Sequence, residues 1–339
     1  MPVSAPERIL VHPSAVEPNL IVTTAQASGF VEDLGGGELR QLLSENDKVV
    51  YQNHVDIRTQ VAAQMAAANV LPGCTITLDY IQTLAYLIRT RQNYNHLDVA
   101  DAGEWNVSLP MAYQLGARQG IAQAIRGANL YGFNASNNEG LVNTPNAVAV
   151  NLPPDPWGNT TLVTYDNGAL SIWLLGEVQA ARQAMFALGL PQKVVFLAPQ
   201  RIIGQLQYQN IVQVVQYQRP GAGSATTGQI VTKIGEENMT EIVWAYDDTL
   251  IGKGSNGTDA MLLVIPEAVI PKAPINTNVF AELTPQTSAM TLQYTASAAP
   301  IEMTGPIGAE AVDFLAMQRV TSGWAPRPQA VTILSIPFE

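Results

Sequence analysis

The sequence predicts an α+β protein, and three patterns carry that prediction. Residues 48–93 alternate apolar and polar side chains in the manner of β-strands. Residues 109–131 place apolar side chains at helical spacing. Residues 145–300 mix helices with short apolar strands, which is the pattern of a layered α/β or α+β domain. Strands are therefore expected on both sides of a long helix and within a mixed domain.

The composition excludes several classes of protein. Charged residues make up 13% of the 339 residues, against about 25% in a typical soluble domain. The hydrophobic fraction is 47%, whereas disordered segments combine low hydrophobicity with high net charge. A net charge of −11 disfavours a nucleic-acid reader, which would carry a basic face. Apolar stretches such as 260–266 are shorter than the ~20 residues of a membrane span, and residues 1–14 show no secretory signal.

Cysteine and lysine are both scarce. The single cysteine, Cys74, excludes an intramolecular disulfide and favours a reducing compartment. Five of the 17 basic residues are lysines: Lys48, Lys193, Lys233, Lys253 and Lys272. Protein–protein interfaces favour Arg and are depleted in Lys and Glu. A surface poor in charge and in Lys is one that other subunits would cover.

The start of the chain predicts an extended arm followed by a long two-stranded segment. Prolines fix φ and remove backbone donors through the first thirty residues, so no helical stripe survives there. Residues 55–61 alternate at strand period, Pro72–Gly73 fits the centre of a type II turn, and alternation resumes at 76–80. An isolated hairpin is marginal in water, and residues 48–93 have few core partners of their own.

The clearest helix is predicted over Leu109–Tyr131. Ser108 suits the N-cap and Gly132 suits the C′ position. One apolar stripe is formed by Ile121, Ala124, Ile125 and Ala128. Three glycines lie within the helix: Gly116, Gly120 and Gly127. Each costs about 1 kcal/mol relative to Ala, so we expect a neighbouring backbone to approach closely at them.

Further elements are predicted beyond this helix. A second helix is expected over 169–188, capped by Asp166 or Asn167 and ended by Gly189. Strands are expected at 193–198, 242–246, 261–265, 314–320 and 331–336.

Candidate chemical sites are weak. His96, Asp98, Asp101 and Glu104 match no metal-ligand spacing, which favours a polar connection before the long helix. Cys74 has no nearby His in the sequence, and no G-x-S-x-G elbow occurs.

The glycine-rich and acidic loops also lack a convincing site. Residues 252–255 and 220–228 lack the residues of a phosphate loop, so mobile loops are favoured. Asp247, Asp248 and Asp259 lie at strand ends, where paired acids hold a cation or initiate turns. The neighbouring glycines favour turns. We therefore expect no catalytic, cofactor-binding or metal-binding residues.

Several segments resemble one family, and they occur in the same order. They are Ser28–Gly35, Asn129–Phe133, Glu139–Pro145 and Val243–Gly252. A helix that ends in Leu-Tyr-Gly and continues through a Gly/Asn turn to Glu-Gly-Leu is typical of the way this fold leaves its spine helix. From about residue 25 to its end, the chain resembles the major capsid proteins of tailed bacteriophages, which have the Hong Kong 97-like fold.

The resemblance implies an organisation and a function. It implies an N-terminal arm at 1–47, an extended loop at 48–93, a peripheral domain at 94–145 completed by 301–339, and an axial domain at 146–300. It also implies a virion capsid protein and no enzyme. Hexamers and pentamers assembled in the bacterial host cytoplasm would close an icosahedral shell around double-stranded DNA, which the protein would contact non-specifically.

The resemblance further implies interfaces and partners. We expect these residues to contact neighbouring subunits: Gly35, Gly36, Gly37, Arg58, Arg89, Arg91, Gly221 and Gly223. Some family members begin with a cleaved scaffolding segment, but only about thirty residues precede the first matching segment here. A separate scaffold protein is therefore expected, together with a portal protein and cementing proteins.

Covalent cross-linking is not expected. Some family members join subunits through a Lys in the extended loop, but no Lys occurs between Lys48 and Lys193. The resemblance combined with this absence predicts a shell held by non-covalent contacts.

Two alternatives remain open. An encapsulin-like nanocompartment shares the fold but encloses enzymes, so cargo and DNA content would separate it from a phage capsid. A soluble metal-dependent enzyme would use Asp247, Asp248 and Asp259 with a divalent cation. It would form a small oligomer and lose activity when those acids are replaced.

Overall fold

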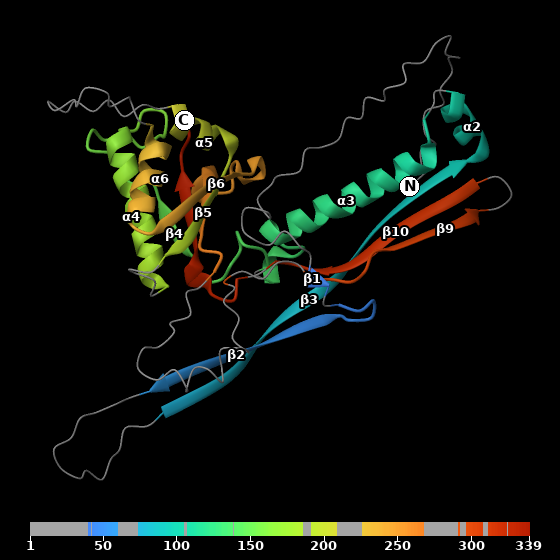
Figure 1. Ribbon diagram of the computed structural model, residues 1–339, viewed down its shortest axis with the longest axis horizontal. Coiled ribbons are helices and arrows are strands. Elements are labelled where there is room, and N and C mark those ends of the chain that lie inside the picture. Colours follow the sequence, from blue (N-terminus) through green and yellow to red (C-terminus); the bar gives the residue numbers. More distant parts are fainter. Residues whose placement is uncertain are drawn as a thin grey trace. The chain divides into compact units, whose positions relative to one another are not determined.

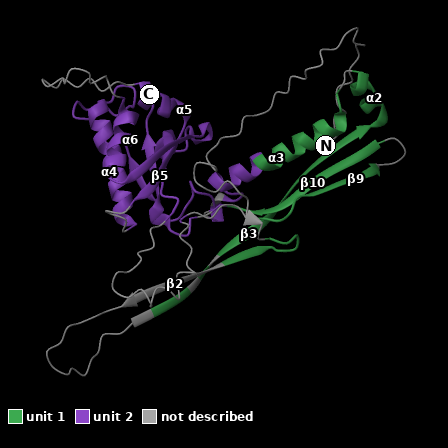
Figure 2. Ribbon diagram, in the orientation of Figure 1, with its two compact units in different colours: residues 1–16, 41–122, 296–322 green, residues 17–40, 123–295, 323–339 purple. Residues whose placement is uncertain are grey.

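A computed structural model of the chain describes residues 40–41, 43–59, 74–104, 107–137, 139–185, 191–208, 226–267, 291, 296–307, 311–323 and 325–339 (Figure 1). The chain divides into two compact units (Figure 2). The described part of the first unit lies within residues 41–122 and 296–322. The described part of the second unit lies within residues 123–291 and 323–339 and also includes Arg40.

The first unit is built on an antiparallel sheet. Its strand order is β1 (Arg40–Gln41), β8 (Ala296–Ser297), β10 (Ala311–Thr321), β3 (Cys74–Asn95) and β2 (Val49–Thr59). A further strand, β9 (Ile301–Ile307), also pairs with β10. The predicted strand at 314–320 is confirmed as β10, whereas β8 and β9 were not predicted.

Strand β3 changes partner along its 22 residues. Its first half pairs with β2, from Cys74 opposite Thr59 to Leu84 opposite Val49. Its second half pairs with β10, from Ala85 opposite Thr321 to Asn95 opposite Ala311. The predicted two-stranded segment is confirmed, and it continues directly into the sheet of the first unit.

Two helices follow β3. The predicted helix is confirmed as α3 (Leu109–Tyr131), and Gly132 ends it with φ +68°. It is preceded by α2 (His96–Glu104), so the predicted polar connection over these residues is helical. Asn95 and Asp98 explain the helix, because each side chain accepts a hydrogen bond from the backbone N–H of the other (2.7 and 3.1 Å).

The glycines of α3 do not behave as expected within the described chain. A Cβ added at Gly116, Gly120 or Gly127 would meet nothing within 4 Å. The expected close approach of a neighbouring backbone is therefore wrong within the described part of the chain. The predicted apolar stripe is largely confirmed, since Ile121, Ile125 and Ala128 are buried.

The second unit contains a mixed five-stranded sheet. Its order is β4 (Val148–Asn151), β11 (Val331–Ile336), β7 (Asp259–Val264), β5 (Gln192–Ala198) and β6 (Thr240–Tyr246). Strands β4 and β11 are parallel, β5 and β6 are parallel, and β7 runs antiparallel to both β11 and β5. The predicted strands at 193–198, 242–246, 261–265 and 331–336 are confirmed within two residues.

Three helices lie beside this sheet (Figure 1): α4 (Asn167–Ala184), α5 (Gln200–Tyr208) and α6 (Thr227–Glu237). Their apolar side chains are buried in a cluster that they share with the sheet. The predicted Asp166 cap of α4 is confirmed, since its carboxylate accepts from the Ala169 N–H at 2.8 Å. Short 3₁₀ turns complete the unit: η1 (Ala135–Asn137), η2 (Asp248–Leu250), η3 (Ser255–Gly257) and η5 (Pro328–Ala330).

Strand β5 is buried on both faces. Val194 and Phe196 belong to the cluster beneath the helices, and Phe196 stacks on Trp244 with ring centroids 4.7 Å apart. Val195 and Leu197 belong to a second cluster on the other side of the sheet. This cluster also contains Leu130 of α3 and Leu250, a residue of the 3₁₀ turn η2. Burial on both faces explains why residues 194–197 are continuously apolar.

Candidate assembly surfaces

The outer part of the two-stranded segment exposes apolar side chains. Ile76, Leu78 and Tyr80 occupy alternate positions of β3, hence one face, with 61%, 75% and 60% of each residue exposed. Tyr80 contacts Tyr51 edge-on across the strands, with centroids 5.6 Å apart. Fully burying such a side chain stabilises by about 1.5–3 kcal/mol, so this face gains several kcal/mol when another surface covers it.

The sheet of the first unit presents arginines on one face. Arg89 and Arg91 lie opposite Met317 and Leu315 of β10, and directly opposed residues share a face. Arg91 donates from Nε to both carboxylate oxygens of Asp313 at 2.9 Å, and this hydrogen bond raises the pKa of Arg91.

The other face of this sheet meets α3. Tyr94 of β3 stacks on Tyr113 of the helix, with centroids 5.7 Å apart. Arg118 of α3 donates from Nε and Nη2 to the carboxylate of Glu302 on β9, at 2.6 and 3.0 Å. The arginine-bearing face therefore lies on the side of the sheet opposite α3, where Leu87 and Met303 are also about half exposed.

The predicted interface residues are only partly within the described chain. Arg89 and Arg91 are exposed, so a role at an interface stays a prediction for both. Arg58 lies in β2 opposite Thr75, but its side chain falls outside the described part. The predicted glycines fall outside the described residues: Gly35, Gly36, Gly37, Gly221 and Gly223.

The three acids considered for a metal-dependent enzyme are each held by structural hydrogen bonds. Asp247 caps η2 by accepting from the Thr249 N–H at 2.9 Å, as expected for a turn residue. Asp248 accepts from the Gln200 N–H at the start of α5 at 2.7 Å. Asp259 is bound by Arg201. Among the described residues, no group of three or more His, Cys, Asp or Glu side chains could hold a metal ion.

The segment between β4 and α4 forms a tied loop that presents a tryptophan. Asp155 is 6% exposed, and its carboxylate accepts from the N–H groups of Trp157, Asn159 and Asp166 and from the Asn159 amide. Burial raises the pKa of Asp155, but these hydrogen bonds outweigh it and lower the pKa overall. Trp157 itself is 83% exposed. The loop therefore holds a large aromatic side chain in solvent.

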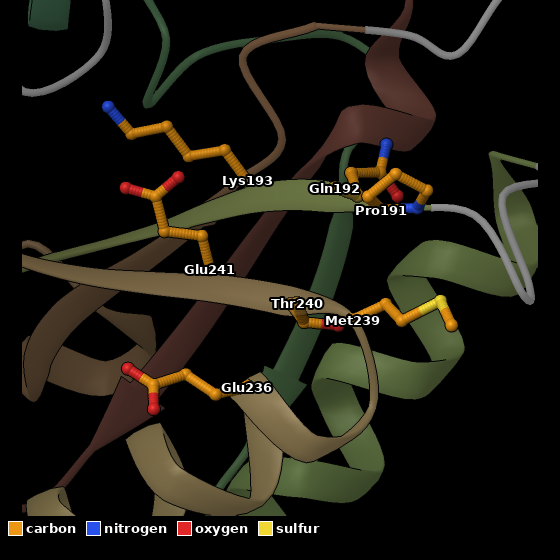
Figure 3. Close-up of a pocket in the computed structure, with 7 residues that line it drawn as sticks. All are labelled: Pro191, Gln192, Lys193, Glu236, Met239, Thr240 and Glu241. Carbon is orange, nitrogen blue, oxygen red and sulfur yellow. The ribbon is translucent and has the colours of Figure 1, made fainter.

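A surface depression of about 530 Å³ lies at the amino ends of β5 and β6. Figure 3 shows Pro191, Gln192 and Met239 along one side of it. The charged side chains lie along the other side: Lys193, Glu236 and Glu241. The depression thus combines an uncharged wall, which includes the apolar side chains of Pro191 and Met239, with a charged one.

Met239 in this wall has an unfavourable backbone conformation. It follows the end of α6 with φ +58°, in the left-handed region where Gly or Asn is preferred. The residue is nonetheless 60% exposed. Neither the backbone nor the burial of Met239 in the subunit explains a methionine there.

Two of the segments that carried the family resemblance, Asn129–Phe133 and Glu139–Pro145, meet in one corner of the second unit. Gly132 and Gly140 both have positive φ (+68° and +89°). The Asn143 amide donates to the Tyr131 and Glu139 carbonyl oxygens, at 3.0 and 3.1 Å. The Glu139 carboxylate accepts from the Phe133 N–H at 3.3 Å. This hydrogen-bonded corner fixes how the chain leaves α3.

Comparison with known proteins adds the fold relationship. No protein-family model and no curated protein matches the sequence. The capsid of Myoviridae phage XM1 matches with a TM-score of 0.66 at 10% identity, over 95% of this chain and 96% of that chain. The capsid of a native GTA particle matches with 0.56 at 12% identity, over 97% and 96%. The capsid structure of cyanophage P-SCSP1u matches with 0.57 at 10% identity, over 96% and 93%.

These similarities extend along nearly the whole of each chain, so this protein has the fold of phage capsid subunits. The predicted fold class is confirmed. Within the described part of the chain, no helix combines the length and apolarity needed to cross a bilayer.

Proposed function

We propose that this chain is the major capsid protein of a tailed phage, the subunit of an icosahedral shell around double-stranded DNA. The observation that carries the proposal is the likeness to phage capsid chains over 95% of this chain and 96% of the first compared chain. A fold shared along nearly the whole of both chains includes extended strands as well as the compact units. Extended strands contribute to assembly when neighbouring subunits cover them.

The exposed face of the two-stranded segment supports this function. In the described chain, β2 pairs with β3 and with no other strand, and an isolated hairpin is marginal in water. Ile76, Leu78 and Tyr80 add exposed apolar area on one side. A neighbouring copy that covers this face would stabilise both the hairpin and the assembly.

The assembly would be held by many modest contacts. Hexamers and pentamers place every subunit against several neighbours, and multivalent contacts in a closed assembly strengthen one another. Because no Lys occurs from residue 49 to residue 192, the extended segment has no lysine for a covalent link. Mature particles should therefore run as single subunits on a denaturing gel, and a ladder of linked subunits would contradict this.

The remaining partners follow from the same function. A separate scaffold protein, a portal protein and cementing proteins would act during assembly in the host cytoplasm. The net charge of −11 suits a non-specific contact with packaged DNA, because a strongly basic wall would retain DNA as it enters.

Electron microscopy of the native assembly tests the function. Closed shells of uniform diameter that contain DNA are expected. Shells filled with protein cargo and free of DNA would indicate a nanocompartment instead. Small dispersed oligomers under all assembly conditions would overturn the proposal.

A further inference from the structure

Two residues of the second unit are not explained by the packing of an isolated subunit. Trp157 leaves 83% of its surface in water, although burying an aromatic side chain is strongly favourable. Met239 takes a left-handed backbone, φ +58°, that is strained for a residue other than Gly or Asn. Glycine would remove that strain, so the presence of methionine indicates that its side chain has a role.

The Trp157 loop is organised before any partner arrives. The buried Asp155 carboxylate ties Trp157, Asn159 and Asp166 together, and Asp155 N–H also donates to the Asn159 carbonyl at 2.9 Å. Asp166 in turn caps α4. A rigid aromatic side chain on a tied loop loses little conformational entropy on binding, which makes it an effective anchor.

The depression beside Met239 offers matching chemistry. Its volume, about 530 Å³, lies within the ~300–1,000 Å³ range of ordinary binding pockets. A methionine sulfur makes favourable contacts with aromatic rings, and a lysine ammonium is attracted to their faces. Gln192 is 7% exposed, and its Oε1 has no hydrogen-bond partner among the described residues. The indole N–H of tryptophan is a donor that such an oxygen accepts.

The two features lie at opposite corners of one sheet. Trp157 follows the carboxyl end of β4, an edge strand, and Leu162 N–H still donates to the Pro337 carbonyl just past the end of β11. The depression lies at the amino ends of β5 and β6, at the other edge. Strands β4, β11, β5 and β6 all run in one direction. Trp157 and the depression therefore lie at opposite ends of these strands as well as at opposite edges of the sheet.

We propose that Trp157 of one copy inserts into the depression lined by Pro191, Lys193 and Met239 of the next copy. The inference rests on the proposed capsid function and adds the contact that joins successive second units. Two different patches on one chain make a head-to-tail contact, which closes into a ring when the rotation allows. The exposed ring of Trp157 suits the sulfur of Met239 and the ammonium of Lys193, so a second copy is the occupant.

Cross-linking tests the contact in the assembled full-length protein. In a Cys74→Ser background, Trp157→Cys and Met239→Cys are placed on separate chains that differ in mass, and the two are mixed before assembly. A short bis-maleimide should then link one chain of each kind. Tyr208→Cys, at a residue of the same unit that is 84% exposed, replaces Trp157→Cys in the control mixture.

The outcomes separate the contact from the capsid function. Linking well above the Tyr208→Cys control supports the contact. Normal shells without such linking overturn the contact and leave the capsid function standing. Failure of the unsubstituted protein to form shells overturns both.

Substitutions provide a second test. Trp157→Ala should weaken subunit association by about thirtyfold, as loss of a buried aromatic anchor does, whereas Tyr208→Ala should leave it within about twofold. Met239→Gly should raise the thermal midpoint of the isolated subunit and yet weaken association. A Met239→Gly protein that assembles as well as the unsubstituted one would contradict the proposal.

Discussion

Arg201 and Asp259 form a two-point ion pair in the second unit. Arg201 Nε lies 2.6 Å from Asp259 Oδ2, and Arg201 Nη2 lies 2.5 Å from Oδ1. The Asp259 side chain is 1% exposed while that of Arg201 is 41% exposed. Gly252 N–H also donates to Oδ1 at 3.0 Å. The pair therefore joins the start of α5 to β7 and to the glycine-rich turn before it.

Removing the arginine should destabilise the subunit. Arg201→Leu leaves a buried carboxylate without its cation, which costs about 3–5 kcal/mol in fully buried pairs. We expect about 1–3 kcal/mol here, because the arginine is 41% exposed and water screens the pair. Denaturant unfolding of the isolated subunit measures the loss. Lys233→Leu, a basic residue of the same unit, is the control, and equal losses would show that the pair has no special role.

The ion pair between Arg118 and Glu302 should make the first unit sensitive to acid. The hydrogen bond from Arg118 lowers the pKa of Glu302 below its ordinary value of 4.5. A lowered carboxylate pKa stabilises the fold fully above the unfolded-state pKa, and this contribution is lost as the pH falls through the folded-state pKa. Stability should therefore decrease as the pH drops below about 4.5.

Glu302→Gln tests that dependence. The variant should be less stable near neutral pH and lose less stability on acidification than the unsubstituted protein. Glu45→Gln, at an exposed acid of the same unit, is the control. The explanation fails if Glu302→Gln and Glu45→Gln give the same profile from pH-dependent unfolding.

The apolar face of the two-stranded segment should control assembly without controlling subunit stability. Leu78 is 75% exposed, so Leu78→Asp should change the free energy of unfolding of the isolated subunit by less than about 0.5 kcal/mol. The same change should abolish shell formation, because a charge would be buried against a neighbour. Thr77→Asp places the charge on the other face of β3. Sedimentation of both variants measures shell formation. Normal shells from Leu78→Asp would contradict the proposed role of this face.

Elements with a strong local pattern were predictable from the sequence. Residues 109–131 and 193–198 were predicted because a capped apolar stripe and a continuous apolar run have few alternative conformations. Strand β9 was missed because Gly305 and Pro306 argue against a strand. Its pairing with β10 supplies the stability, and an edge strand tolerates proline. Thr226 and Gln229 form a capping box at the start of α6. Their spacing in the sequence was a signal that could have revealed that helix.

The candidate surfaces were less predictable than the fold. The alternation at 76–80 indicated a strand, but only the pairing register shows that β2 and β3 leave one face uncovered. Trp157 and Met239 carry no sequence signal of exposure or of positive φ, because both depend on how the loops close around Asp155 and α6. Arg89 and Arg91 were named as interface residues, and the sheet places them on one face, where Arg91 binds Asp313.

Glycines at two positions should respond oppositely to alanine, and the contrast tests the corner that follows α3. Gly140 has φ +89°, and a Cβ there would meet the Tyr131 carbonyl carbon at 2.4 Å and the Leu130 oxygen at 2.6 Å. Gly140→Ala should therefore cost about 3 kcal/mol or more, from strain and from displacement of packed backbone. Gly120 lies inside α3 with nothing within 4 Å of its added Cβ, so Gly120→Ala should stabilise the subunit by about 1 kcal/mol. Thermal unfolding measures both, and a tolerated Gly140→Ala would mean that the hydrogen-bonded corner is not what fixes the chain's exit from the helix.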